Sequence, residues 1–184
     1  MIETIIKSFI KIITLSLTST FLNIAVTSAS MENTLETGSS LLAVRNNDCK
    51  TIYNRYDIIV FHYPLDESQI YIKRIIGLPG EHVEIINGEI FINHNTSSLP
   101  DQYRKETKNT DNSHYVFEVP KDSYLVLGDN RNHSIDSRYW CNLALDSGIT
   151  TDLKTAEGMR YVKEEQIIAK AFLKYYPSTE FLYP

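Results

Sequence analysis

The chain has 184 residues, of which 42% are hydrophobic and 22% are charged, and its formal net charge at pH 7 is −5. This size and composition suit one globular domain with a hydrophobic core, and the acidic balance argues against a general nucleic-acid-binding surface. Cys49 and Cys141 are too few for a disulfide framework, and sequence separation alone leaves open whether they pair. No His/Cys cluster has metal-ligand spacing in the sequence, so we expect neither a metal nor a cofactor.

The N-terminal segment has the character of a membrane anchor. Lys7 and Lys11 precede an uncharged run over residues 12–31, which is about as long as a spanning helix requires but is diluted by Ser, Thr and Asn. It suits a cleaved signal peptide, a weak anchor, or an anchor that continues into a strand near Phe21. We assign residues 1–22 to an anchor and residues 23–184 to a catalytic domain outside the cytoplasm, because lysines mark the cytoplasmic end.

The rest of the chain predicts a mostly β domain, since β-branched and aromatic residues dominate its apolar runs. Residues 38–46 and 55–64 each predict a strand, and the second has the continuous apolar run of a strand buried on both faces. Residues 68–93 hold two or three more strands. Within them, residues 83–92 predict a hairpin, because Asn87-Gly88 suits the positive φ angles of a type I′ turn.

The second half of the chain contains fewer clear elements. Residues 94–114 are polar and predict a long loop or a small excursion, whereas two strands are expected shortly after it, the second ending near Gly128. Residues 143–161 show no clear hydrophobic period, so no helix or strand is assigned to them. Residues 164–177 predict a closing strand, although their composition also admits a helical turn.

Three segments carry residue types suited to chemistry. In residues 71–81, strict alternation puts Lys73 and Arg74 on opposite faces of a strand, so one of them should face the apolar side. A desolvated lysine could act as a base, because burial lowers its pKa from about 10.4. Residues 124–140 run from an apolar strand into a charged loop, and residues 27–35 supply the hydroxyls of Ser28 and Ser30.

The segments SASMENTLETG, RYDIIVF, YIKRIIGLPGE and GDNRNHSIDSR resemble the ordered motif blocks of bacterial type I signal peptidases, which are membrane-anchored Ser–Lys proteases. The resemblance runs from about Ser28 to Arg138 and continues weakly to Phe172. It implies an all-β catalytic core, related to the fold of repressor-type Ser–Lys proteases, with an N-terminal membrane tether helix. It also implies a substrate peptide that binds in an extended conformation beside a strand.

The resemblance implies a role for each matching residue. Ser30 would be the nucleophile and Lys73 the general base. Ser28 would complete the oxyanion hole with the Ser30 N–H, Met31 would line the substrate site, and Ser134 would orient Lys73. Charged residues around the site would give structural support: Arg74, Asp129, Arg131, Asp136 and Arg138.

The implied protein is a monomeric serine endopeptidase that removes signal peptides from exported preproteins at small-x-small sites. It would contact the lipid bilayer through one spanning segment, with its catalytic domain on the periplasmic side of the cytoplasmic membrane, and would bind no nucleic acid. Three positions depart from the family pattern. Asn33 stands in place of a proline, Tyr56 in place of a glycine and Glu81 in place of an aspartate.

Other functions are also compatible with parts of this pattern. A signal peptidase of the conjugative-transfer type would have narrow substrates, and a catalytically decayed homologue would be a non-enzymatic periplasmic β-domain. A self-cleaving repressor-type protease would need an N-terminal DNA-binding domain, for which residues 1–29 are too few and too apolar. The five histidines and Cys141 fit structural or exposed positions better than catalytic ones.

Overall fold

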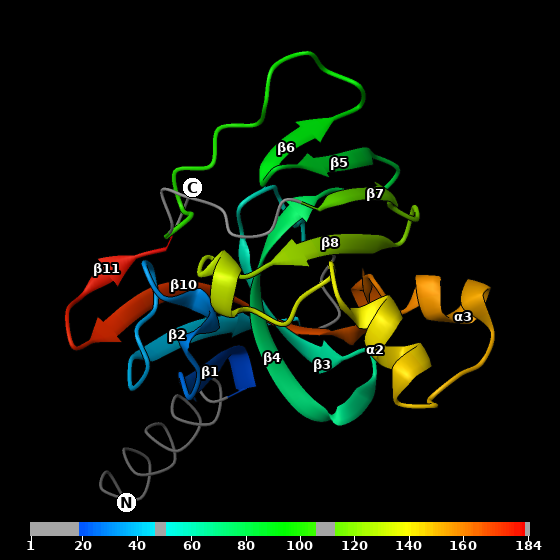
Figure 1. Cartoon of the computed structure of the whole chain (residues 1–184). Coiled ribbons are helices and arrows are strands. Elements are labelled where there is room, and N and C mark those ends of the chain that lie inside the picture. Colours follow the sequence, from blue (N-terminus) through cyan, green and yellow to red (C-terminus); the bar gives the residue numbers. More distant parts are fainter. Residues whose placement is uncertain (1–18, 47–50, 106–112, 183–184) are drawn as a thin grey trace, which may run out of the picture.

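The structure is a computed structural model that describes residues 19–46, 51–105 and 113–182. It is mostly β, as the sequence predicts. The larger sheet has the strand order β1-β2-β10-β3-β4-β8-β9, and a three-stranded sheet has the order β6-β5-β7. In Figure 1 the smaller sheet lies above β8, and the long, curved β4 runs from the larger sheet towards it. The strands are β1 (Phe21–Ala25), β2 (Ser40–Arg45), β3 (Ile58–Tyr63), β4 (Asp66–Gly77), β5 (His82–Ile86), β6 (Glu89–Ile92), β7 (His114–Glu118), β8 (Ser123–Leu127), β9 (Val162–Lys163), β10 (Ile167–Tyr176) and β11 (Glu180–Phe181).

The predicted strands are confirmed, and the hairpin has the predicted turn. β5 and β6 pair antiparallel with Ile86 opposite Glu89, and both residues between them have positive φ, 50° at Asn87 and 81° at Gly88. The closing segment contains both predicted conformations, because the 3₁₀ turn Glu164–Gln166 leads directly into β10.

The unassigned region after the charged loop forms two short helices, which the sequence did not predict. α2 (Trp140–Asp146) and α3 (Leu153–Gly158) pack together through the small buried side chains of Cys141, Ala144 and Ala156. Helices this short gain their stability from packing rather than from intrinsic propensity. Cys141 is a free, buried thiol, and Cys49 lies outside the described residues.

Most of the predicted anchor, residues 1–18, also lies outside the described residues. Its last two residues begin β1, which pairs with β2 from Phe21 to Ala25, so the strand starts two residues before the predicted domain boundary. Val26, next along the chain, is buried in the core with Met31 and Leu41. Within the described part of the chain, no helix has the length and apolar character needed to cross a membrane.

Candidate active site

Ser30 and Lys73 are 43 positions apart in the sequence but lie next to each other in the fold. The Lys73 Nζ lies 2.7 Å from the Ser30 Oγ. Ser30 is in the short 3₁₀ turn Ala29–Met31 that follows β1, and Lys73 is in β4. Both residues are buried, with exposed fractions of 7% and 4%. The amine also donates to the Ile72 carbonyl at 3.1 Å, which helps to fix its position.

The environment of Lys73 favours a neutral amine. Burial lowers the pKa of Lys73 from an ordinary value of 10.5 to about 8, although the charges of Asp136 and Asp129 oppose this shift. Desolvation has this effect because it destabilises the charged form. A neutral amine at hydrogen-bonding distance from a hydroxyl can accept its proton, so the pair has the geometry of a nucleophile with its base, and above about pH 8 the amine is mainly in the neutral form that this role requires.

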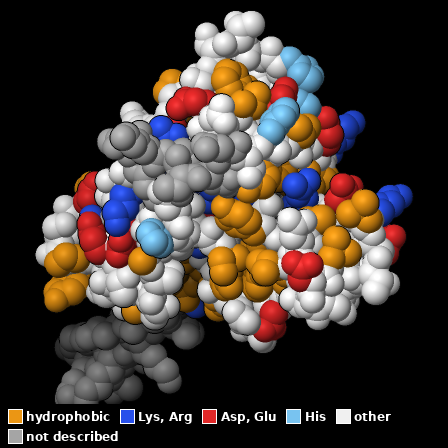
Figure 2. Space-filling model, in the orientation of Figure 1, with side chains coloured by type: hydrophobic (Ala, Val, Ile, Leu, Met, Phe, Trp, Pro, Cys, Tyr) orange, Lys and Arg blue, Asp and Glu red, His pale blue; other side chains and the backbone are white. Residues whose placement is uncertain are grey.

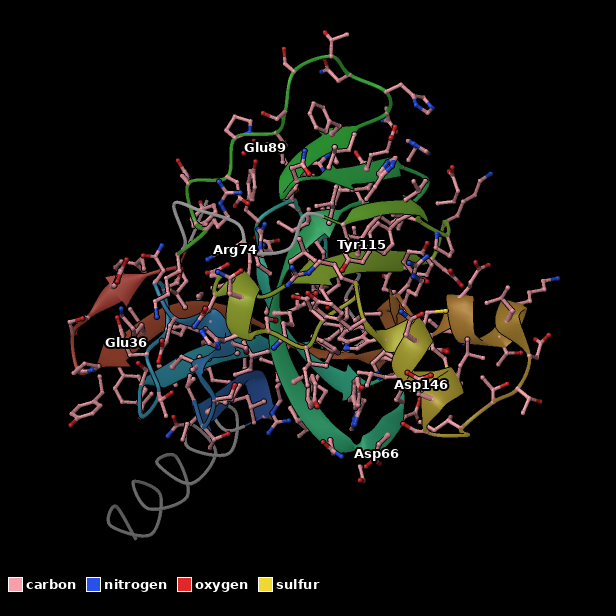
Figure 3. All side chains as sticks on the ribbon, viewed as in Figure 1. Glu36, Asp66, Arg74, Glu89, Tyr115 and Asp146 are labelled. Carbon is pink, nitrogen blue, oxygen red and sulfur yellow. The ribbon has the colours of Figure 1, made fainter. Side chains whose placement is uncertain are left out.

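The two acidic residues near Lys73 are each paired with an arginine. Asp129 receives two hydrogen bonds from Arg74, at 2.8 Å from Nε and 2.7 Å from Nη2, and a third from the Thr34 hydroxyl at 2.6 Å. Arg74 also donates to the Tyr56 carbonyl at 2.7 Å. Figure 3 shows Arg74 in the middle of the molecule, between the small sheet and β1–β2. The bidentate contact compensates the Asp129 charge inside the core.

Asp136 is held in the same way by Arg138. Its carboxylate accepts from Arg138 Nε at 2.8 Å and Nη2 at 3.0 Å, and from the Gly128 N–H at 3.0 Å. Burial acts to raise the pKa of Asp136, but the charge and hydrogen bonds of Arg138 outweigh it and hold the pKa below its ordinary value. Because both carboxylates are paired, their field raises the Lys73 pKa less than bare charges would.

Arg131 connects this loop to a distant segment. Its Nη1 forms an ion pair with the Asp101 carboxylate at 2.7 Å, and its Nε donates to the Gly128 carbonyl at 2.9 Å. Arg138 in turn donates to the Arg131 carbonyl at 2.8 Å. The charged residues predicted from the Gly-Asp-Asn-Arg block therefore lie together and are buried.

Ser28 and Ser134 differ in how closely they approach the pair. The Ser28 Oγ lies 3.3 Å from the Ser30 Oγ, although the chain turns at Ala29 rather than staying extended. The Ser134 Oγ is buried and makes no hydrogen bond to the Lys73 amine within the described part of the chain, whereas hydrogen bonding by the Ser134 side chain helps to lower the pKa of Asp136. It packs against Gly128, where an added Cβ would also meet the Ser30 carbonyl oxygen at 2.5 Å.

A groove of about 580 Å³ opens beside Ser30 and Lys73. One wall is β1 and the turn after it, and the other is the first half of β4. In the described sheet, β1 pairs only with β2, and β4 pairs with β8 only from Arg74 onwards. Both walls therefore present unpaired strand edges to the groove. Its apolar lining includes Leu22, Ile24, Met31, Val60, Ile70, Ile72 and Ile135.

The sequence did not point to several residues of the site. Tyr71 lines the groove, and its ring lies 5.4 Å from the Lys73 Nζ. It stands two positions before Lys73, so alternation along the strand could have identified it. Asn130 holds the Ser30 turn, with its N–H 3.1 Å from the Ser30 carbonyl and its Nδ2 3.0 Å from the Ala29 carbonyl. No sequence signal singles out the Asn130 contacts.

Comparison with known proteins places this chain in a family. Residues 1–176 match the sequence profile of the family described as "Signal peptidase, peptidase S26". A "Probable signal peptidase I-2" from Synechocystis sp. is 31% identical, over 83% of this chain and 62% of that protein. A "Signal peptidase I" from Leptolyngbya laminosa is 32% identical, over 83% of this chain and 67% of that protein.

A solved structure of a signal peptidase I from Enterococcus faecalis has a TM-score of 0.48 and 29% identity, covering 65% of this chain and 97% of that chain. The present chain spans about three fifths of the length of the Synechocystis protein. The profile match includes Ser30, Lys73 and the whole charged loop. The chain therefore belongs to the signal peptidase family, peptidase S26.

Proposed function

We propose that this protein is a serine endopeptidase that removes signal peptides from exported preproteins, with Ser30 as nucleophile and Lys73 as general base. The observation that carries the proposal is the 2.7 Å approach of a buried, pKa-lowered lysine amine to a buried serine hydroxyl. The relatives named signal peptidase I support the substrate class.

The geometry supports an acyl-enzyme mechanism. With Lys73 neutral, the Ser30 hydroxyl donates its proton to Nζ as Oγ attacks the carbonyl carbon of the scissile bond. Lys73 then returns the proton to the leaving amine when the C–N bond breaks. A water molecule then attacks the ester carbonyl as it gives a proton to neutral Lys73. Lys73 passes that proton to the Ser30 Oγ when the ester C–O bond breaks, which releases the carboxylic acid product and restores the Ser30 hydroxyl.

Ser28 fits the role of an oxyanion-hole donor. Its hydroxyl is 3.3 Å from the Ser30 Oγ, so it can reach the oxygen of a carbonyl whose carbon bonds to Oγ. The Ser30 backbone N–H is the second donor in this proposal. A donor of this kind stabilises the transition state by about 3–4 kcal/mol. Ser134 would act on Lys73 only after a change in its hydroxyl position, since it makes no hydrogen bond to the amine here.

The groove supports an extended substrate. A peptide strand lying between β1 and the first half of β4 could pair with either free edge, which is how extended peptides commonly add to sheets. The apolar wall formed by residues such as Ile24, Met31 and Ile72 suits an uncharged segment. In this proposal the segment ahead of β1, residues 1–20, attaches the enzyme to the cytoplasmic membrane, so that the groove meets substrates on the far side.

The test is cleavage of a preprotein by the purified full chain in detergent. We expect wild type to cut after a small-x-small sequence, and Ser30→Ala and Lys73→Met to lose at least about 1,000-fold in kcat. Ser39→Ala is the matched control, because Ser39 is buried but does not line the groove, and it should keep wild-type activity. Full activity in Ser30→Ala, or inert wild type in both detergent and lipid, would refute the proposal.

A further inference from the structure

Three of the five histidines converge on one carboxylate in the three-stranded sheet, away from the groove. Glu84 in β5 has His82 Nε2 at 3.1 Å and His94 Nδ1 at 3.5 Å from one oxygen, and His114 Nε2 at 3.1 Å from the other. None of these residues lines the groove beside Ser30. In Figure 2 histidine side chains gather at the top of the molecule, over the region of the smaller sheet.

The spacing of these atoms matches that of metal ligands. The ligand atoms of His82, Glu84 and His94 all lie within 4.8 Å of one another. Zinc bonds to imidazole nitrogen and carboxylate oxygen at about 2.0–2.2 Å, so neighbouring ligands of a tetrahedral ion lie roughly 3.3–3.5 Å apart. The 3.1 Å and 3.5 Å separations from the Glu84 oxygen already fall near this spacing, and the two histidine nitrogens, which lie within 4.8 Å of each other, would turn towards a bound ion.

A second carboxylate holds the His82 ring in the orientation that a metal ligand needs. Glu118 Oε1 is 2.6 Å from His82 Nδ1, on the opposite side of the ring from Glu84. A hydrogen bond from Nδ1–H to a carboxylate leaves Nε2 as the basic nitrogen and fixes its direction, and metal-binding histidines commonly have such a partner.

The backbone also directs His94 into the cluster. Asn93 and His94, directly after β6, have φ angles of 53° and 59°, a region that residues other than glycine seldom occupy. Asn93 bonds back to His82 twice, from its N–H to the carbonyl at 2.8 Å and from the His82 N–H to its Oδ1 at 3.0 Å. This reversal stacks the His94 ring on His82, with centroids 4.0 Å apart.

We propose that His82, Glu84 and His94 bind a divalent transition metal of the zinc class. Two imidazoles with one carboxylate favour zinc over magnesium or calcium, which prefer all-oxygen sites. His114 holds the other Glu84 oxygen at 3.1 Å from its Nε2 and so supports the carboxylate ligand from the opposite side. His94 begins the polar excursion over residues 94–114, so the ion would join the start of that excursion to β5, which is a structural role distinct from the proposed peptidase chemistry.

Zinc titration of the chelator-treated full chain by calorimetry in detergent tests the inference. We expect about one zinc ion per chain in wild type, and binding weakened at least about tenfold in Glu84→Gln and His94→Asn. Asparagine suits position 94 because it tolerates the positive φ there. Glu118→Gln should weaken binding by about 10- to 100-fold. His62→Asn is the matched control, since His62 bonds to the Glu67 carbonyl outside the cluster, and it should bind as wild type does.

Two outcomes would overturn the inference. If wild type takes up no zinc at micromolar concentration, the chain has no such site. If zinc binding is unchanged in Glu84→Gln and His94→Asn, the ion binds elsewhere on the chain. Magnesium binding as tight as zinc binding would contradict coordination of the ion by histidine nitrogens. Because the readout is metal binding rather than cleavage, its failure leaves the proposed peptidase function untouched.

Discussion

At the scale of single residues, Lys73 shows how a lysine can have a pKa near neutrality while charged groups surround it. Burial lowers its pKa to about 8 against the opposing charges of Asp136 and Asp129. Arg138 and Arg74 pair with those carboxylates through bidentate contacts. The buried arginines therefore support the base indirectly, by balancing charges that would otherwise keep Lys73 protonated.

The pKa of Lys73 predicts the pH dependence of activity. If the neutral amine is the base, kcat/KM should rise with pH to a plateau with a midpoint near pH 8, and fall about tenfold per pH unit well below it. Cleavage rates measured from pH 6 to 10 check this. Lys121→Met, which removes an exposed lysine, should leave the midpoint unchanged, whereas a midpoint near pH 10 would rule out a desolvated base.

The same shift has a consequence for stability. The folded-state pKa of about 8 lies below the ordinary 10.5, so the unfolded chain binds more protons at Lys73 between these values. Its contribution to the free energy of unfolding therefore rises with pH across this window and is least favourable below pH 8. Lys73→Met should lose this slope in urea titrations at pH 7.5 and pH 10.

Two of the three departures from the family pattern lie at positions where the backbone has a positive φ angle. Asn33, in place of the family proline, has a φ of 98°, and Tyr56, in place of the family glycine, has a φ of 72°. Glycine adopts the second value freely, and Tyr56 instead gains a hydrogen bond from its hydroxyl to the Pro100 carbonyl at 2.6 Å. Glu81, in place of the family aspartate, reaches Arg55 at 2.6 Å.

Restoring the family proline at position 33 should destabilise this chain. Proline fixes φ near −65°, so Asn33→Pro must rebuild the turn after Ser30 and should lower the free energy of unfolding by more than about 1 kcal/mol. Asn33→Gly keeps the positive φ and loses only the Nδ2 bond to the Tyr103 carbonyl, a change of about 1 kcal/mol or less. Chemical denaturation of both variants measures these changes in the free energy of unfolding. An Asn33→Pro variant as stable as wild type would contradict the turn geometry.

At the scale of elements, the strands were predictable because their signals are local. Alternation, β-branched runs and Asn87-Gly88 identify the strands and the hairpin without tertiary information. The helices α2 and α3 were not predictable, because each is held by burial of Cys141, Ala144 and Ala156 against the other. The meeting of Ser30 with Lys73 depends on the turn after β1 lying against β4, although three strands separate β1 from β4 in the sheet order, and only the family resemblance suggested it.

The element β1 also separates the competing interpretations of the N-terminal segment. A signal-peptide cut after Ala29 would remove a strand that pairs with β2 along its whole length and would expose the core around Leu41 that Val26 covers. The chain around Phe21 is therefore part of the folded sheet, which argues against a cut after Ala29.

Gly128, directly after β8, lies so close to the Ser30 turn that a side chain at this position should disturb the turn. An alanine Cβ at Gly128 would clash with the Ser134 side chain and would lie 2.5 Å from the Ser30 carbonyl oxygen. Gly128→Ala should push the Ser30 turn outwards, and a shift near 1 Å at a reacting group can lower kcat about 100-fold. Gly158→Ala, where nothing lies within 4 Å of the new methyl, is the control. Equal kcat for both variants would show that the contact is not needed.

At the scale of the whole molecule, the two sheets share one buried apolar cluster. β4 pairs with β3 and β8 in the larger sheet and ends at Gly77, five residues before β5 begins the smaller sheet. Ile76 and Leu125 from the larger sheet pack with Val83 and Phe117 from the smaller one. Because this contact is apolar and fully buried, the two sheets should unfold together rather than in sequence.

The only tryptophan provides a probe of that cooperativity. Trp140 is buried against Phe61 and Tyr63 in the larger sheet, whereas Phe117 is buried at 1% exposure in the smaller sheet. Phe117→Ala leaves a cavity and should lower the free energy of unfolding by about 3–5 kcal/mol. If the core is one unit, thermal unfolding followed by Trp140 fluorescence should shift by as many degrees as unfolding followed by far-ultraviolet circular dichroism. A fluorescence transition that stays in place would show instead that the smaller sheet unfolds independently of the sheet that carries Lys73.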